Sequence, residues 1–376
     1  MRIVRLAALA ALLLPVAAFP KDEILLGHVA SMTGSEATFG DSTDKAIRLA
    51  IDEQNKKGGI KGKQLALKTL DDGGKPEEAQ VAATRLIVND KVTILFGEVA
   101  SSRSLAMAPV ADDKKVPMIS PSSTNPKVTL DNAGKTRPFV FRVCFIDPFQ
   151  GTVMAKFAKE KGLKKVAILR DVGNAYSVGL ADFFADGFKK RGGQIVADLS
   201  FKAGDQDFKA QLTKIKQASP EAIYVPAYYT DVGLIARQVR ELGMKQPLMG
   251  GDGWDSEKLY EIAGGALDGS YFSNHYTQES PDPKVKDFIA KYQAAYGAVP
   301  DALAAMGYDA ALVAFDAMNR AKDLSGAAIA DAIAATKEFK AVTGTISLDP
   351  QHNAVKPAVV IGIKDNAGHY AATVNP

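Results

Sequence analysis

Residues 92–120, VTILFGEVASSRSLAMAPVADDKKVPMIS, contain a complete strand–helix–strand unit. The apolar runs Val92–Phe96 and Val116–Ile119 have the length of buried strands, and Ser101-Ser102 between them is typical of a helix start. Strands that alternate with helices in this way predict a parallel sheet with helices on both of its faces.

The same alternation continues on both sides of this unit. Further strands are predicted at Ile24–Val29, Leu65–Leu70, Val166–Leu169, Ile195–Leu199, Ala222–Val225 and Pro247–Met249. Helices are predicted at Asp44–Lys56, Glu77–Asn89, Phe149–Lys161, Leu180–Arg191, Phe208–Gln217 and Val232–Leu242. The predicted fold class is therefore α/β, with doubly wound parallel sheets.

The order of these elements occurs twice along the chain. In each half a helix ends at a glycine pair, Gly58-Gly59 and Gly192-Gly193, because glycine adopts the left-handed backbone of a helix end at little cost. A strand, a helix, a strand, a helix and a strand then follow in both halves. A chain of 376 residues is also too long for one ordinary core. We therefore expect two lobes with one architecture.

Residues 1–18 have the form of a secretory signal peptide. Two arginines precede the short apolar run Leu6–Leu14, and Val16 and Ala18 occupy the positions that a signal peptidase inspects. The alternative, a membrane anchor, needs about twenty apolar residues. We expect export to the periplasm with cleavage after Ala18, and no later segment is long and apolar enough to span a bilayer.

Charge and cysteine content exclude several classes of function. The formal charge of +3 falls to +1 once Arg2 and Arg5 are removed, since 44 basic side chains then face 43 acidic ones. A protein with so little net charge has no excess of basic side chains for binding nucleic acid. Cys144 is the only cysteine, in an apolar stretch that predicts a buried thiol, so an internal disulfide is impossible. The four histidines are scattered singly, and we expect no metal and no cofactor.

The loops after the predicted strands indicate where a ligand would bind. In open parallel sheets, ligands bind beyond the carboxyl ends of the strands. Three such loops belong to the first half (31–33, 97–102 and 120–125) and three to the second half (171–176, 228–231 and 250–254). If the two sheet edges face each other, all six loops line one cleft.

Polar side chains in these loops suit the two charged ends of an amino acid. Ser101 opens a helix whose free amides would attract a carboxylate, although it can instead cap its own helix. Asp252 lies in GGDGWD (250–255) and suits an ammonium group, although it can also form an Asx turn. The hydroxyl-rich loop 120–126 is equally explained as a turn. Aromatic residues in or near the same loops favour a pocket: Phe39, Tyr176, Tyr228, Tyr229 and Trp254.

Catalytic motifs are missing from the sequence. It contains no Gly-x-Ser-x-Gly elbow, no phosphate-binding loop, no His-Glu-x-x-His and no dinucleotide fingerprint after the first strand. An enzyme on the same sheet architecture is an alternative that lacks a candidate nucleophile or acid–base pair.

Seven stretches resemble the leucine/isoleucine/valine-binding family of periplasmic binding proteins, the type I receptors of ABC transporters. They are Phe39-Gly40-Asp41, Asn55–Gly62, Asp71-Asp72, Ser101-Ser102, Ile119–Pro126, Tyr228-Tyr229 and Met249–Gly253. Their order and spacing extend the resemblance over essentially the whole chain after the leader.

The resemblance implies two lobes joined by three crossovers: 19–142 with 272–345, and 143–271 with 346–376. It implies a monomeric, non-enzymatic receptor that closes its lobes on a small amino acid, with leucine, isoleucine or valine as the expected ligands. The implied partner is an inner-membrane ABC permease. A periplasmic sensor that binds an amino acid or amide without transport is the alternative.

The resemblance also implies which residues hold the charged groups of the ligand. Ser101 and Thr124 would hold the α-carboxylate. The Ser122 carbonyl, the Thr124 hydroxyl and Asp252 would hold the ammonium group. Better-known members of the family have Glu where Asp252 stands, and Asp is one methylene shorter, so the ligand or the lobe must come closer or a water must bridge the gap.

Four further residues would surround the ligand. Tyr228 would reach it from the second lobe on closure, and Phe39, Val99 and Tyr176 would form the wall of the side-chain pocket. Better-known members have a bulkier aromatic residue at Phe39, and a disulfide that this chain lacks. No cationic side chain occurs among the matched positions, which argues against a dicarboxylate ligand.

Overall fold

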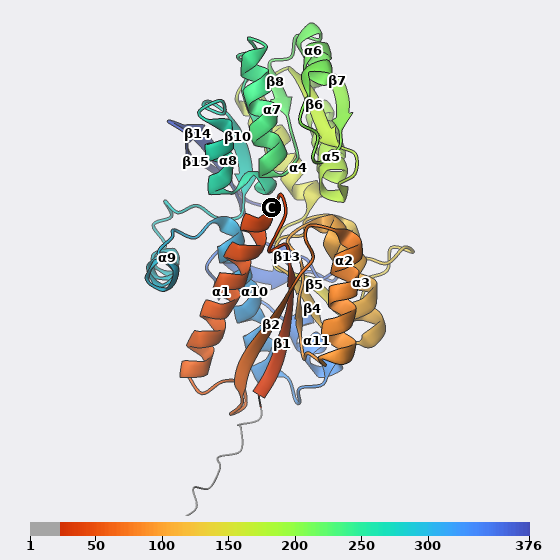
Figure 1. Cartoon of the computed structure of the whole chain (residues 1–376), viewed down its shortest axis with the longest axis vertical. Helices are drawn as coiled ribbons and strands as arrows, with labels where there is room; N and C mark the ends of the chain where they lie inside the picture. The colour runs from red at the N-terminus through yellow and green to blue at the C-terminus, as the bar shows by residue number, and fades with distance from the viewer. Residues whose placement is uncertain (1–22) are drawn as a thin grey trace, which may run out of the picture.

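The computed structural model describes residues 23–376. They form two lobes that lie one above the other along the longest axis of the molecule, each with a central sheet and surrounding helices (Figure 1). The predicted signal peptide lies outside the described residues.

The first lobe is built on a five-stranded sheet in which all neighbours are parallel. Its strand order is β2-β1-β3-β4-β5. The strands are β1 (Glu23–Ala30), β2 (Gln64–Asp71), β3 (Leu95–Phe96), β4 (Met118–Ser120) and β5 (Val140–Arg142). The strand order changes direction between β1 and β3, and such a switch point leaves a crevice beyond the carboxyl ends of the strands.

Helices cover both faces of this sheet. One face is covered by α1 (Ala37–Lys56), α9 (Pro283–Tyr296), α10 (Ala302–Arg320) and α11 (Gly326–Ala334), and the other by α2 (Pro76–Thr84) with its π-helical extension (Arg85–Asn89) and α3 (Ser101–Lys114). Side chains alternate along a strand, so β1 places Ile24 and Leu26 in the first buried cluster and Val29 in the second. The sheet is therefore buried on both sides, as its apolar strands predict.

The second lobe repeats this topology. Its sheet has the order β15-β14-β10-β9-β8-β6-β7, and the parallel part, β7-β6-β8-β9-β10, matches the first lobe strand for strand. These strands are β6 (Lys165–Asp171), β7 (Gln194–Phe201), β8 (Ala222–Tyr224), β9 (Leu248–Gly250) and β10 (Tyr271–Asn274). The antiparallel strands β14 (Ala358–Lys364) and β15 (Ala367–Val374) complete the sheet.

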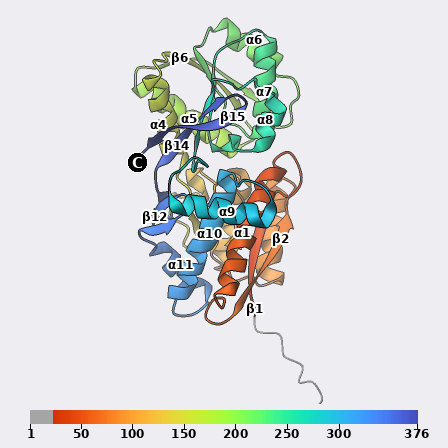
Figure 2. The same ribbon diagram turned by 90° about the vertical axis from the view of Figure 1, so that its left-hand side faces the viewer.

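Five helices pack around the second sheet. They are α4 (Asp147–Glu160), α5 (Ala175–Lys190), α6 (Lys209–Gln217), α7 (Tyr229–Glu241) and α8 (Glu257–Ala263). Figure 2 shows α4 on one side of the sheet and α7 and α8 on the other. The doubly wound α/β architecture predicted from the sequence is confirmed in both lobes.

The chain passes between the lobes three times: after β5, after β10 and after the short sheet β11 (Phe339–Ala341), β12 (Gly344–Leu348) and β13 (Ala354–Val355). The expected boundary at 271/272 falls inside β10, which pairs with β9 and β14 of the second sheet. The expected boundary at 345/346 falls inside β12, whose Ile346 packs in a core cluster of the first lobe. The second passage therefore follows Asn274 rather than residue 271, and the third follows Val355 rather than residue 345.

Each of the eight predicted strands and six predicted helices coincides with an element of the structure. The largest difference among the strands is at 92–96, where only Leu95 and Phe96 pair with neighbouring strands. Among residues 23–376, no helix is both long and apolar enough to cross a membrane.

Candidate functional site

The carboxyl ends of both parallel sheets point toward the boundary between the lobes (Figure 1). Hydrogen bonds cross this boundary. Ala175 N donates to Ser102 Oγ at 2.9 Å, and Thr230 Oγ1 donates to the Ser35 carbonyl at 2.7 Å. The predicted loops therefore face one another in a closed arrangement of the two lobes.

Ser101 is the first residue of α3 and does not cap its own helix. The N-cap is Ala100, which offers no side-chain acceptor to the first-turn amides. The buried Ser101 Oγ instead accepts a hydrogen bond from Asn125 N at 3.2 Å. A helix N-terminus without a side-chain cap has free N–H groups and a partial positive charge, which favour an anion.

Thr124 lies beside this helix start in the loop after β4. It is fully buried, and its Oγ1 forms no hydrogen bond of regular geometry within residues 23–376, although it lies beside the Asp147 carboxyl, whose pKa it lowers. An unpaired buried hydroxyl costs about 1–3 kcal/mol. A bound oxygen or ammonium group at this position would remove that cost.

Asp147 is the first residue of α4, and its amide donates to the Thr124 carbonyl at 2.9 Å. Burial raises the pKa of Asp147 to about 8, and the carboxylate of Asp252 adds to this shift. The carboxyl of Asp147 is therefore largely uncharged at neutral pH and does not compete with Asp252 for a cation.

Asp252 begins a short 3₁₀ turn (Asp252–Trp254) after β9 and is almost completely buried. Gln150 Nε2 donates to its Oδ1 at 2.7 Å and Ser122 Oγ donates to its Oδ2 at 3.1 Å, while His275 Nε2 lies 3.0 Å from Oδ2. Burial by itself raises the pKa of Asp252, but these three hydrogen bonds outweigh it and lower the pKa. The carboxylate is therefore ionised. Each carboxylate oxygen can accept two hydrogen bonds, and Oδ1 accepts only the one from Gln150, so it can accept one more.

Two glycines allow this turn to lie against the aromatic residues of the second lobe. A Cβ atom at Gly251 would lie 2.4 Å from Tyr176 Oη, and one at Gly253 would lie 2.8 Å from Tyr228 Cδ1. Both distances are shorter than the contacts that real Cβ atoms make with their neighbours. The glycines around Asp252 are therefore required by packing.

His275 is the part of this site that sequence reasoning missed. Its ring is buried and stacks on Phe145 with a centroid distance of 3.9 Å. Burial lowers the pKa of His275 in spite of the neighbouring Asp252 carboxylate. The imidazole is therefore neutral at pH 7, and its Nε2–H donates to the carboxylate. His275 lies 23 residues from Asp252 in the sequence, so no local pattern indicated that the two side chains meet.

The four apolar residues expected around the ligand come from both lobes. Tyr176 and Tyr228 stack with a centroid distance of 5.4 Å and an interplanar angle of 7°, and Phe39 of the first lobe meets Tyr228 edge-on at 5.5 Å. Val99 belongs to the same hydrophobic cluster. The Tyr228 hydroxyl is buried beside Asn174.

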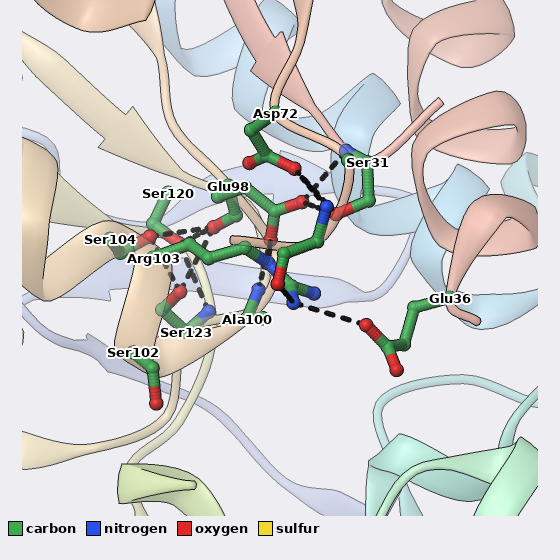
Figure 3. Close-up of polar contacts among 12 residues, drawn as sticks. Ser31, Glu36, Asp72, Glu98, Ala100, Ser102, Arg103, Ser104, Ser120 and Ser123 are labelled. Atoms are coloured by element: carbon green, nitrogen blue, oxygen red, sulfur yellow. Dashed lines mark hydrogen bonds and ion pairs between the residues drawn. The ribbon is translucent and has the colours of Figure 1, made fainter. Parts of the chain in front are cut away.

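A buried charge cluster in the first lobe supports the loops around α3 (Figure 3). Arg103 forms ion pairs with Glu98 at 3.2 Å and with Glu36 at 3.1 Å, and its guanidinium lies over the Tyr228 ring at 5.9 Å. The guanidinium is thus a buried cation close to the interface that the sequence matches did not include. Its charge is balanced by these two carboxylates, while its Nη2 has no hydrogen-bond partner within the described residues.

The carboxylates of this cluster fix the ends of β1, β2 and β3. Glu98 accepts from Ser31 N at 2.9 Å and from Ala100 N at 2.6 Å, while Ser31 Oγ donates to Asp72 at 2.9 Å. Burial, together with the Glu98 carboxylate, raises the pKa of Asp72 to about 7. Sequence reasoning missed this cluster, although Asp72 and Glu98 stand just after predicted strands and could have indicated it.

Other predicted features can be compared with the structure. Cys144 is buried, and burial raises the pKa of its thiol to about 12, which fits the expected inert side chain. Among residues 23–376, no group of His, Cys, Asp and Glu side chains is arranged to hold a metal ion.

Comparison with known proteins identifies relatives over nearly the whole chain. Residues 23–368 match the family described as "Periplasmic binding protein". The Leu/Ile/Val-binding protein homolog 3 of Brucella melitensis is 34% identical over 331 residues, which cover 86% of this chain and 87% of that protein.

Solved structures agree with these sequence relatives. A leucine-binding protein of Thermotoga maritima has a TM-score of 0.89 at 41% identity and covers 94% of this chain and 99% of its own. A branched-chain amino acid transporter substrate-binding protein of Streptococcus pneumoniae was solved in complex with isoleucine. It has a TM-score of 0.88 at 35% identity, and the match covers 94% of this chain and 100% of that protein. The chain therefore belongs to the periplasmic binding protein family and, within it, to the Leu/Ile/Val-binding proteins.

Proposed function

We propose that this chain is the substrate-binding receptor of an ABC transporter and that it binds a small aliphatic amino acid, leucine, isoleucine or valine, between its lobes. The observation that carries the proposal is the opposition of two complementary groups across one buried interface. The first lobe offers hydroxyls and the uncapped start of α3, and the second lobe offers an ionised carboxylate that lies 3.1 Å from Ser122 Oγ.

The two groups suit the two ends of a zwitterion. Ser101, Thr124 and the first amides of α3 hold the α-carboxylate, since they are donors at the positive end of a helix. The Ser122 carbonyl, the Thr124 hydroxyl and the free position on Asp252 Oδ1 hold the ammonium group. The unpaired Thr124 hydroxyl supports this assignment, because the ligand supplies the partner that it lacks.

The walls of the site suit an aliphatic side chain. The surface is formed by four residues of one hydrophobic cluster: Phe39, Val99, Tyr176 and Tyr228. It favours an aliphatic ligand side chain over a charged one. Arg103 is already paired with Glu98 and Glu36. A second carboxylate on the ligand would have to compete with these two carboxylates for the one buried guanidinium, which is unfavourable.

Binding and closure are coupled in this mechanism. The free receptor exchanges between open and closed arrangements, and a ligand that contacts both lobes favours the closed one by its differential affinity. Asp252 and Tyr228 contribute only when the lobes meet. The lobe arrangement then reports occupancy to an inner-membrane permease.

The remaining parts of the proposal concern compartment and activity. The signal-like residues 1–18 and the periplasmic family support export to the periplasm. The binding-protein family and the missing catalytic motifs support a receptor without enzymatic activity, and the expectation that it is a monomer rests on the resemblance alone.

A ligand screen on the mature protein, residues 19–376, tests the proposal. Leucine, isoleucine and valine should raise the melting temperature in proportion to the logarithm of their concentration, since they bind only the folded state. Aspartate and lysine serve as charged comparisons and should have no effect. No shift with any aliphatic amino acid would refute the ligand class, and chemically altered ligand after incubation would indicate an enzyme. Uptake by reconstituted permease separates transport from sensing alone.

A further inference from the structure

A pocket lies between the lobes, outside the proposed amino acid site. Its volume is about 540 Å³. The first lobe contributes the start of α1, part of α9 and the segment that leads into α10, and the second lobe contributes α8, β10 and the β14–β15 hairpin. None of the eight residues assigned to the amino acid site lines it.

Carboxylates without a cationic partner line this pocket. Asp255 Oδ2 accepts from Ala302 N at 2.6 Å, and Asp301 Oδ1 accepts from Ala304 N at 2.7 Å, so the two carboxylates meet at the start of α10. Neither of them, nor Glu257, forms an ion pair within residues 23–376. The other acidic groups in the lining do have partners, since Asp41 pairs with Lys45 and Glu279 with His369.

The two central carboxylates repel each other. Burial raises the pKa of Asp301 to about 7, and the charge of Asp255 adds to this shift. Burial also raises the pKa of Asp255. A bound cation would remove this repulsion.

An unpaired hydroxyl points to a ligand independently of the carboxylates. Tyr276 lines the pocket with only 4% of its surface exposed, and its Oη has no hydrogen-bond partner within the described residues. Tyr260 and Tyr292 also line the pocket. Aromatic faces beside carboxylates attract organic cations, because the ring quadrupole is negative above the plane.

We propose that this pocket binds a small organic ammonium ion, held by Asp255 and Asp301, hydrogen-bonded to Tyr276 Oη and enclosed by tyrosine rings. A bare metal ion is a poorer occupant, since no metal-binding group of side chains occurs in residues 23–376 and hard cations require several oxygen ligands. The volume accommodates an alkyl amine of several carbons.

The bound amine also links the lobes, because α1 and the start of α10 belong to one lobe and α8 and β10 to the other. It therefore favours the closed arrangement and tightens amino acid binding, and the effect is reciprocal. This linking role depends on the closure mechanism proposed above, whereas amine binding itself does not.

Calorimetric titration of the mature protein with 1,4-diaminobutane tests the site, with 1,4-butanediol as the uncharged match. The diamine should bind saturably and the diol should not. Asp301→Asn should weaken diamine binding at least tenfold while preserving the fold, since Asn also caps a helix. Tyr276→Phe, which removes only the hydroxyl, should weaken it severalfold. Asp323→Asn removes an exposed carboxylate that also accepts a backbone hydrogen bond, and should leave binding unchanged.

The outcomes separate this proposal from the amino acid site. No saturable diamine binding, or equal loss in Asp301→Asn and Asp323→Asn, would overturn the amine pocket even if leucine binds as proposed. Diamine binding that leaves the leucine affinity unchanged would overturn the linking role. Diamine binding without any amino acid binding would support the pocket and refute the proposed function instead.

Discussion

The two lobes have the same sheet topology but use buried charge in different ways. In the first lobe, Arg103 pairs with both Glu98 and Glu36, so the ion pairs of this cluster lie within one lobe. In the second lobe, Asp252 receives a hydrogen bond from Ser122, which belongs to the first lobe. A repeated fold therefore holds one charge cluster that stabilises a lobe and another that depends on closure.

This difference predicts which changes affect folding and which affect binding. Substitutions in the first-lobe charge cluster should chiefly lower the free energy of unfolding of the protein without ligand. Residues that meet at the interface should chiefly affect ligand affinity. Four substitutions test the distinction, from the largest expected effect to the smallest.

Arg103→Met should have the largest effect, on stability. Loss of the guanidinium leaves Glu98 and Glu36 buried and unpaired, which costs about 3–5 kcal/mol. Arg170→Met is the matched control in the second lobe, because its partners Asp182 and Asp198 are exposed and such pairs contribute about 0–1 kcal/mol. Thermal and urea unfolding of the ligand-free proteins measure both. Equal losses in the two variants would contradict a structural role for the first-lobe cluster.

Asp252→Ala should have the next largest effect, on affinity. Removal of one partner of a buried charge pair costs about 2–5 kcal/mol in binding, or roughly 30-fold to several thousand-fold in Kd for leucine. Glu241→Ala, at the exposed end of α7, is the control and should bind as tightly as the unchanged protein. Calorimetry on both variants provides the comparison. An unaltered Kd in Asp252→Ala would remove this residue from the site.

Thr124→Val should separate binding from stability within one residue. The Thr124 hydroxyl forms no hydrogen bond of regular geometry within the described residues and has only the Asp147 carboxyl beside it, so its replacement by a methyl group of similar size should leave the melting temperature nearly unchanged. The same change removes a hydrogen bond to a charged ligand group, which costs about 1.5–3 kcal/mol in binding. Melting and leucine titration are measured on the same preparation. A lower melting temperature with normal affinity would show that the hydroxyl has a structural role instead.

The fold was largely predictable from the sequence because its signals are local. Apolar strands, glycine pairs at helix ends and the repeated order between residues 24 and 249 identify both lobes. Two of the three passages between the lobes were placed too early in the chain, and the one after β10 was missed because the pairing of β10 with β14 joins segments almost 90 residues apart. The strand β5 is missing from the predictions because it ends in Arg142, whose buried guanidinium is hydrogen-bonded to backbone carbonyls of the loop after β4.

The site was predictable only where a loop carries its own signal. Ser101 and Asp252 stand next to predicted strand or helix ends, so position alone singled them out. His275 and Gln150 have ordinary local sequences and acquire their significance from Asp252, which lies 23 and 102 residues away. Partnerships of this kind depend on tertiary packing.

His275→Gln should have the smallest effect and should appear only as a change in pH dependence. Burial lowers the pKa of His275 below the 6.5 of an unfolded chain, so the unfolded state takes up a proton first and stability is lost as the pH falls through this range. Glutamine can still donate a hydrogen bond to Asp252 but does not titrate. Between pH 7.5 and 5 the unchanged protein should therefore lose about 1 kcal/mol more stability than the variant, for each unit of pKa shift. Buried carboxyls with raised pKa, such as Asp72, change stability in the opposite sense but equally in both proteins, so the difference in melting temperature isolates the histidine. Parallel pH profiles for the two proteins would mean that the Asp252–His275 contact does not titrate.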